Sequence, residues 1–180
     1  MLKPIIDFFR RRTIKKHSGA IQTGLLPLSD ISSVNVIIDV EEVGYDILKE
    51  NILAWGRTSG LKVNIYFFDF RKLAKDELLL TSITNTITKR DLNWIGIPVY
   101  EKVATLFEEQ SDLLISLIDN SDSPIDYISQ CTRARFKIGR KAYPGHSFDL
   151  VISGKQPDGL RSGGGQVFAA ITEFLGKISK

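Results

Sequence analysis

The feature that most constrains the fold of this chain is an alternation of short apolar runs with helical segments, which is clearest between Asp112 and Ser153. There, an apolar run (DLLISLID) is followed by a polar loop (NSDSP), a helical segment and a second apolar run (FDLVIS). Strands that are separated by helices form βαβ units, which assemble into parallel sheets with right-handed crossovers. The alternation therefore predicts an α/β fold. We expect a single three-layer sandwich, Rossmann-like or flavodoxin-like, around a mostly parallel sheet of about five strands.

The same alternation extends over most of the 180 residues. The run VNVIIDV is almost continuously apolar, which is typical of a strand buried on both faces of a parallel sheet. Apolar runs predict strands at residues 34–40, 61–70, 91–99, 113–118 and 148–153, and helical periodicity predicts helices at 1–17, 45–55, 101–110, 124–136 and 166–180. Residues 71–90 fit neither pattern well, and we expect a short helix followed by an exposed loop.

Composition excludes several classes of protein. A hydrophobic content of 43% with 25% charged residues is ordinary for a soluble globular domain. The single cysteine, Cys131, cannot form an internal disulfide, and His17 and His146 lie too far apart in the sequence for zinc-ligand spacing. No apolar run approaches the roughly 20 residues that span a bilayer. We therefore expect a cytoplasmic protein without a transmembrane segment, a metal site or a cofactor.

The N-terminal segment differs in character from the rest of the chain. Residues 1–33 combine a basic amphipathic helix with a linker of small and turn-forming residues, whereas residues 34–180 form the α/β domain. The helix carries a dense group of cations: Arg10, Arg11, Arg12, Lys15 and Lys16. Three interpretations remain open: a terminal helix that packs on the domain, an anchor on a membrane surface, or an arm that contacts the phosphates of RNA.

Acidic side chains and a glycine-rich turn follow several of the predicted strands. In open α/β sheets, ligands bind outside the carboxyl ends of the strands. This rule selects the strand-end carboxylates and the turn before the last helix as candidate ligand contacts: Asp39, Asp69, Asp119, Asp122, Ser162, Gly163 and Gly164. The alternative is purely structural, because an acidic residue before Pro124 is also a helix N-cap, and a glycine-rich turn is also a helix start.

A second group of cations lies in the stretch from Asp112 to Ser153. Its members are Arg133, Arg135, Lys137, Arg140 and Lys141, at the end of the helix predicted for residues 124–136. Cations at the end of a helix offset the helix dipole, which is a structural role. The same residues could instead present a patch to RNA or to another phosphate.

Two resemblances attach to these motifs. The order of a basic helix, VNVIIDV, Trp94 and Gly96, DLLISLID, ARFKIG and FDLVIS resembles an uncharacterised bacterial family of the Bacteroidota type. That resemblance implies a Rossmann-like domain, a cytoplasmic location and no known activity. The stretch from Asp112 to Gly139 is also similar to the N-terminal half of heptosyltransferases, which implies the fold and not the activity.

The residues point to no reaction, since neither a nucleophile with its base nor a metal-ligand pattern is present in the sequence. Our first hypothesis is therefore a non-catalytic binding or adaptor protein. It would contact RNA, a ribosomal surface or an anionic membrane through its basic surfaces. The alternative is an enzyme or ligand-binding domain that acts on a phosphorylated small molecule or nucleotide at the carboxyl ends of the strands.

Overall fold

A computed structural model describes residues 2–19, 21–72, 81–82, 84–154 and 163–178, and confirms the predicted α/β fold. Its sheet has six parallel strands in the order β3-β2-β1-β4-β5-β6, which is the order of a Rossmann-type doubly wound sheet. The strands are β1 (Ser33–Asp39), β2 (Lys62–Asp69), β3 (Thr86–Thr88), β4 (Ser111–Ser116), β5 (Ala134–Gly139) and β6 (Leu150–Val151). The α-helices are α1 (Leu2–His17), α2 (Tyr45–Ser59), α3 (Tyr100–Glu108), α4 (Asp122–Cys131) and α5 (Gly164–Lys177).

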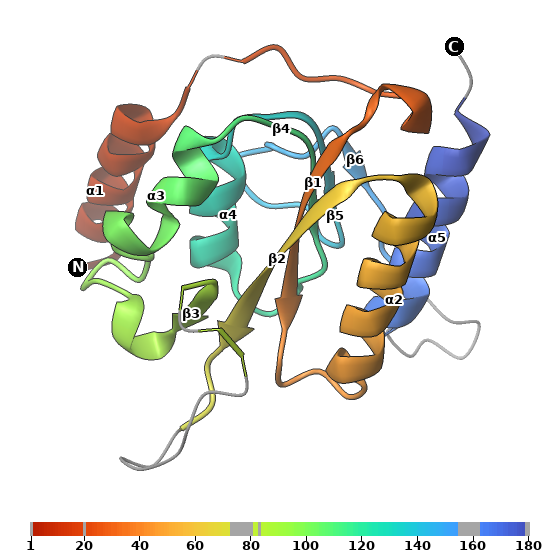
Figure 1. The fold of residues 1–180 in the computed structure, drawn as a ribbon. Helices are drawn as coiled ribbons and strands as arrows, with labels where there is room; N and C mark the ends of the chain where they lie inside the picture. The colour runs from red at the N-terminus through yellow and green to blue at the C-terminus, as the bar shows by residue number, and fades with distance from the viewer. Residues whose placement is uncertain (1, 20, 73–80, 83, 155–162, 179–180) are drawn as a thin grey trace.

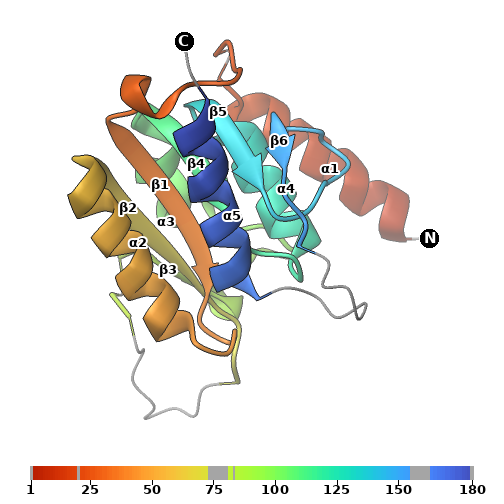
Figure 2. The ribbon, with the colours of Figure 1, turned by 90° about the vertical axis from the view of Figure 1, so that its right-hand side faces the viewer.

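The helices cover both faces of the sheet, so the molecule has three layers. Helices α2 and α5 lie on one face, and α1, α3 and α4 lie on the other (Figures 1 and 2). The central strand β1 supplies both cores, because alternate side chains of a strand point to opposite faces. Val36 and Ile38 join the core under α2 and α5, whereas Ile37 joins the core under α3 and α4.

The strand predicted for residues 91–99 is wrong. The chain there forms a turn, with Gly96 at φ +74°, and an isolated antiparallel bridge joins Leu92 to Pro98. Asn93 stabilises the turn, since its Oδ1 accepts hydrogen bonds from the backbone N–H groups of Ile95 and Ile97. Ile95 and Ile97 are buried, but Trp94 is exposed, and the glycine in the left-handed region ends any extended run.

The third strand lies earlier, at Thr86–Thr88, in the segment that we expected to be a loop. Its β-branched residues suit a strand that pairs with β2, and Ile87 is fully buried in the core under α3 and α4. The short helix predicted before it falls largely on residues 73–80, which lie outside the described residues, as does residue 83.

The helix predicted for residues 124–136 is also wrong at its C-terminal end. Helix α4 ends at Cys131, and β5 follows after two residues. Ala134, Phe136 and Ile138 of β5 are fully buried, with a polar residue between each pair. That alternation is the period of a strand. Its polar positions are cations, which are also typical of the last turn of a helix, and the segment was therefore predicted to be helical. The missed strand raises the count from about five to six.

Helix α1 packs beside α4 without burying any of its residues. Ile6 and Ile14 contact the core under α3 and α4, and the Arg10 Nε donates to the Ile95 carbonyl at 2.5 Å. The ring of His17 stacks on Tyr100 with 4.5 Å between the ring centroids. The helix is thus held by a few contacts along one side, and its other side faces solvent.

Cys131 gives a test of this packing. It is fully buried at the end of α4, and the Ile14 carbonyl of α1 lies 3.8 Å from its Sγ. Burial raises the pKa of the Cys131 thiol to about 12, so little of the reactive thiolate is present at neutral pH. We expect the folded protein to react with a thiol reagent at least about 100-fold more slowly than the urea-unfolded chain, measured by the absorbance of the released thiolate. Fast reaction in the absence of urea would contradict the packing of α1 over this end of α4.

Candidate functional site

The loops after β1 and β4 form a pocket at the carboxyl edge of the sheet. The strand order reverses direction at this point, because β2 lies on one side of β1 and β4 on the other. A doubly wound sheet opens a crevice at such a switch point. The pocket has a volume of about 390 Å³ and is lined by Asp39, Glu41, Glu42, Leu117, Ile118, Asp119, Asn120 and Arg140.

Arg140 lines this pocket and is 9% exposed. Its Nη1 donates to both carboxylate oxygens of Glu42, at 3.1 and 3.0 Å, and to the Leu117 carbonyl at 3.0 Å. Its Nη2 lies 3.4 Å from Oδ2 of Asp119. The guanidinium therefore joins the loop after β1 to the loop after β4, and its positive charge is shared between two carboxylates.

Glu42 also binds the start of α5. The backbone N–H of Gly164 donates to the Glu42 carboxylate, which satisfies one of the N–H groups that a helix start leaves open. A Cβ at position 164 would lie only 2.8 Å from Glu42, so glycine allows this approach. Gly163 precedes the helix as its N-cap, and Ser162 lies outside the described residues. A phosphate at this helix start would meet the carboxylate of Glu42.

The other strand-end carboxylates have separate partners. Asp39 accepts hydrogen bonds from Asn120 Nδ2 and from the Glu41 N–H, both at 2.8 Å. Asp69 is paired with Arg71 through Nε at 2.8 Å and Nη2 at 2.7 Å, and this pairing lowers the pKa of Asp69. Asp122 pairs with Lys141 at 2.7 Å. The structure thus brings Asp39 and Asp119 into one pocket and leaves Asp69 and Asp122 outside it.

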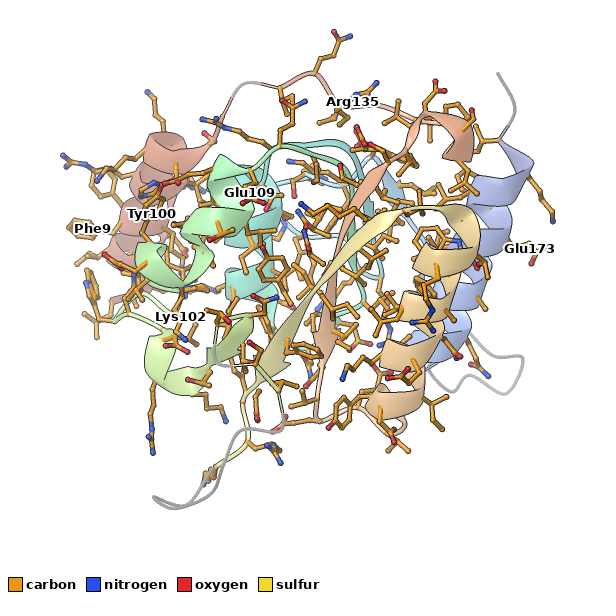
Figure 3. All side chains as sticks on the ribbon, in the orientation of Figure 1. Phe9, Tyr100, Lys102, Glu109, Arg135 and Glu173 are labelled. Carbon is orange, nitrogen blue, oxygen red and sulfur yellow. The ribbon has the colours of Figure 1, made fainter. Side chains whose placement is uncertain are left out.

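The cations from Arg133 to Lys141 do not form one surface, because the segment is a strand. Lys137 lies beneath α4, and its Nζ donates to the Ser129 carbonyl at 2.7 Å. Burial lowers the pKa of Lys137. Arg140 is buried in the pocket, whereas Arg135 binds Asp112 at 3.0 Å near the opposite edge of the sheet (Figure 3). The cations at positions 135, 137 and 140 therefore have partners within the domain.

The cations of α1 are more concentrated than those of any other segment. The helix carries six lysine or arginine residues and one acidic residue, a net charge of +5, so the rest of the chain is net −2 because the total is +3. Arg10 is turned toward the domain, where it binds the Ile95 carbonyl and lies 3.6 Å from Asp7. The remaining α1 cations are exposed: Lys3, Arg11, Arg12, Lys15 and Lys16.

Large apolar side chains are exposed next to these cations. We define the apolar face as Leu2, Ile5, Phe8 and Phe9 of α1 together with Trp94. Their exposed fractions are 72%, 49%, 61%, 39% and 67%, in that order. The Phe9 and Trp94 rings meet edge to face with 5.3 Å between centroids, and Figure 3 shows Phe9 pointing away from the domain. The sequence showed the apolar spacing of α1, but not that Trp94 would join it, because residues 91–99 were predicted to be a strand.

The described residues contain no helix with the length and apolar content that a bilayer crossing requires. Within the same residues, no group of three or more histidine, cysteine, aspartate or glutamate side chains is arranged to hold a metal ion.

Comparisons with known proteins identify a family without identifying an activity. Neither the curated proteins nor the solved structures contain a match to this chain. The similarity to heptosyltransferases and the bacterial origin therefore stay predictions. A family model does match residues 7–159, which is most of the chain. The chain belongs to DUF6913, a family of unknown function.

Proposed function

We propose that this protein binds anionic membrane surfaces from the cytoplasmic side as a non-catalytic peripheral protein, and that α1 contacts the lipid. The observation that carries the proposal is the coincidence on one helix of a net charge of +5 with an exposed apolar face. Helices that lie in the membrane interface combine these two features. The cations draw the protein to anionic headgroups, and the apolar side chains enter the acyl boundary.

Helix α1 also has the position that this role needs. It lies at the outside of its layer and leaves one side open to solvent (Figure 2). Trp94 extends the apolar face beyond the helix, and indole rings favour the boundary between headgroups and acyl chains. The cytoplasmic leaflet is the anionic one, so it offers the charge that α1 complements.

RNA is the competing partner, and the apolar face disfavours it. Proteins bind single-stranded RNA by combining a cationic track with aromatic rings on which bases stack. Leu2 and Ile5 have no planar surface for stacking, although they are 72% and 49% exposed. Both residues suit insertion among acyl chains, so the composition of the face favours a membrane.

The test is flotation with vesicles of phosphatidylcholine, with or without phosphatidylglycerol. We expect binding only when phosphatidylglycerol is present, and weaker binding as salt rises. The double variant Ile5→Ser/Phe8→Ser should bind at least about tenfold more weakly. Each substitution removes a large apolar side chain and with it the free energy gained when that side chain moves from water into the membrane.

The matched control is Leu25→Ser/Val43→Ser, which removes two exposed apolar side chains outside α1, of 61% and 101% exposure. This variant should bind as the wild type does. Binding to a single-stranded RNA but not to the vesicles would overturn the proposal and support the RNA hypothesis. Equal losses in the two double variants would show that α1 is not the contact.

A further inference from the structure

A groove of about 760 Å³ lies between α1 and α4, beside the proposed membrane-binding face. Its size falls within the range of about 300–1,000 Å³ that is usual for small-molecule sites. One wall comes from α1 and includes Lys3, Arg11 and Lys15, and the opposite wall comes from α4 and includes Asp122 and Asp126. Asp7 and Arg10 also line the α1 side, where they lie 3.6 Å apart and offset each other's charge. The α1 wall is therefore net positive and the α4 wall net negative.

The three cations are available to a ligand. Within the described ranges, none of Lys3, Arg11 and Lys15 has a hydrogen-bond or ion-pair partner for its side chain. They follow one another along the helix at intervals of eight and four residues, which places them on one side of it. Such a row suits a phosphate group, because lysine and arginine bind phosphate by charge-assisted hydrogen bonds.

Asp126 gives the opposite wall a negative charge that no cation in the described residues compensates. Its Oδ1 accepts from Gln130 Nε2 and from the Gly145 N–H, each at 3.0 Å, and both donors are neutral. The loop holds the carboxylate in place, since a Cβ at position 145 would lie 2.5 Å from Oδ1. Oδ2 has no partner among the described residues, which leaves it open to a cationic donor.

We propose that this groove binds a phosphate that carries a primary amine, which is the headgroup of an aminophospholipid such as phosphatidylethanolamine. The phosphate would lie against Arg11 and Lys15, and the ammonium group would donate to Asp126. A primary ammonium has three N–H donors, whereas the trimethylammonium of phosphatidylcholine has none. This inference rests on the proposed function, because the membrane would supply the phosphoethanolamine headgroup that the groove binds.

The experiment compares vesicles with the same phosphatidylglycerol content, in which phosphatidylethanolamine replaces part of the phosphatidylcholine. We expect the wild type to bind the vesicles with phosphatidylethanolamine about three- to fivefold more tightly, which is the effect of one partly exposed charge pair. Asp126→Asn keeps an acceptor for Gln130 and Gly145 but removes the charge. This variant should lose the preference and keep its binding to phosphatidylglycerol.

Two further variants separate the groove from general charge attraction. Arg11→Gln/Lys15→Gln and Arg12→Gln/Lys16→Gln remove the same charge from α1, but only the first pair lines the groove. The first should abolish the preference for phosphatidylethanolamine, and the second should lower binding to both kinds of vesicle and keep the ratio. Two outcomes would overturn the proposal that the groove binds phosphoethanolamine: vesicle binding by the wild type without a preference for phosphatidylethanolamine, or a preference that survives Asp126→Asn. Neither outcome would contradict the proposed function.

A soluble probe tests the groove without a membrane. In an NMR titration, phosphoethanolamine should shift the Gly145 amide, which binds Asp126, and inorganic phosphate should shift it at least about fivefold less at the same concentration. If no vesicle binds the protein, the proposed function fails and this titration alone decides the groove. Equal responses to the two probes would show a phosphate site without amine recognition, and no response would show no site.

Discussion

Replacing Asp112 by alanine is expected to lower the free energy of unfolding by about 3 kcal/mol, because one carboxylate holds three strands together at the amino edge of the sheet. Asp112 Oδ2 accepts from the backbone N–H and the hydroxyl of Ser32, at 2.9 and 2.8 Å, and from both groups of Ser33 at 3.1 Å. Its Oδ1 accepts from Arg135 Nη1 at 3.0 Å. These contacts join β4 to β1 and β5. A loss of this size should lower Tm by about 6–12 °C in a domain of this length.

The loss should also depend on pH. Burial alone would raise the pKa of Asp112, but the hydrogen bonds from Ser32, Ser33 and Arg135 outweigh it and hold the pKa well below its usual range. A lowered folded-state pKa stabilises the protein fully above the unfolded value of about 3.9, and this stabilisation is lost as pH falls toward the folded value. Urea unfolding of wild type and Asp112→Ala should therefore differ by a constant amount above about pH 5 and converge below about pH 4. A difference that stays constant to the lowest pH would contradict the role of the charge.

Replacing Arg140 by methionine should lower the free energy of unfolding by about 3 kcal/mol or more, because Glu42 and Asp119 lose the buried cation that they share. Glu42 and Asp119 would remain close together, with side chains that are 19% and 20% exposed. Their mutual repulsion would loosen the loops after β1 and β4. Equilibrium urea unfolding measures the loss, and the pocket edge should show faster hydrogen exchange at Gly164, whose N–H binds Glu42.

Two further variants show how the loss at Arg140 arises. Arg140→Lys keeps the charge but offers one compact ammonium in place of a planar fork, so it should restore only part of the stability. In Arg140→Met/Glu42→Gln, the partner charge is also removed, and the double variant should be less destabilised than the sum of the single variants by about 1–2 kcal/mol. Simple additivity would mean that Glu42 and Arg140 do not stabilise one another.

The elements with a long apolar run were predicted from the sequence. The elements whose conformation depends on a single backbone angle or on contacts with distant residues were missed. Strand β1 was predicted almost to the residue, because VNVIIDV is buried on both faces and is apolar apart from Asn35 and Asp39. Strand β5 was missed because Arg135 and Lys137 resembled a helix end. The stretch at residues 91–99 has the hydrophobicity of a strand, but the left-handed φ of Gly96 decides its conformation.

The candidate sites were harder to predict, for a related reason. Asp39 and Asp119 line the same pocket, because parallel strands end at the same side of a sheet, and their role as ligand contacts stays a prediction. Glu42 was not selected, and its role depends on Arg140, 98 residues away in the sequence, and on Gly164, 122 residues away. The pairing of such residues is decided by the order of strands in the sheet, and local pattern carries no information about that order.

The two outermost strands have a consequence for self-association. The described edge strands have three residues in β3 and two in β6, whereas the interior strands have six to eight. An edge strand offers unpaired N–H and C=O groups to another chain, and short edges offer few of them. A protein that collects on a membrane reaches a high local concentration, where long open edges would favour aggregation. On the membrane binding proposed above, the short edges of this sheet would give crowded copies few backbone groups through which to pair.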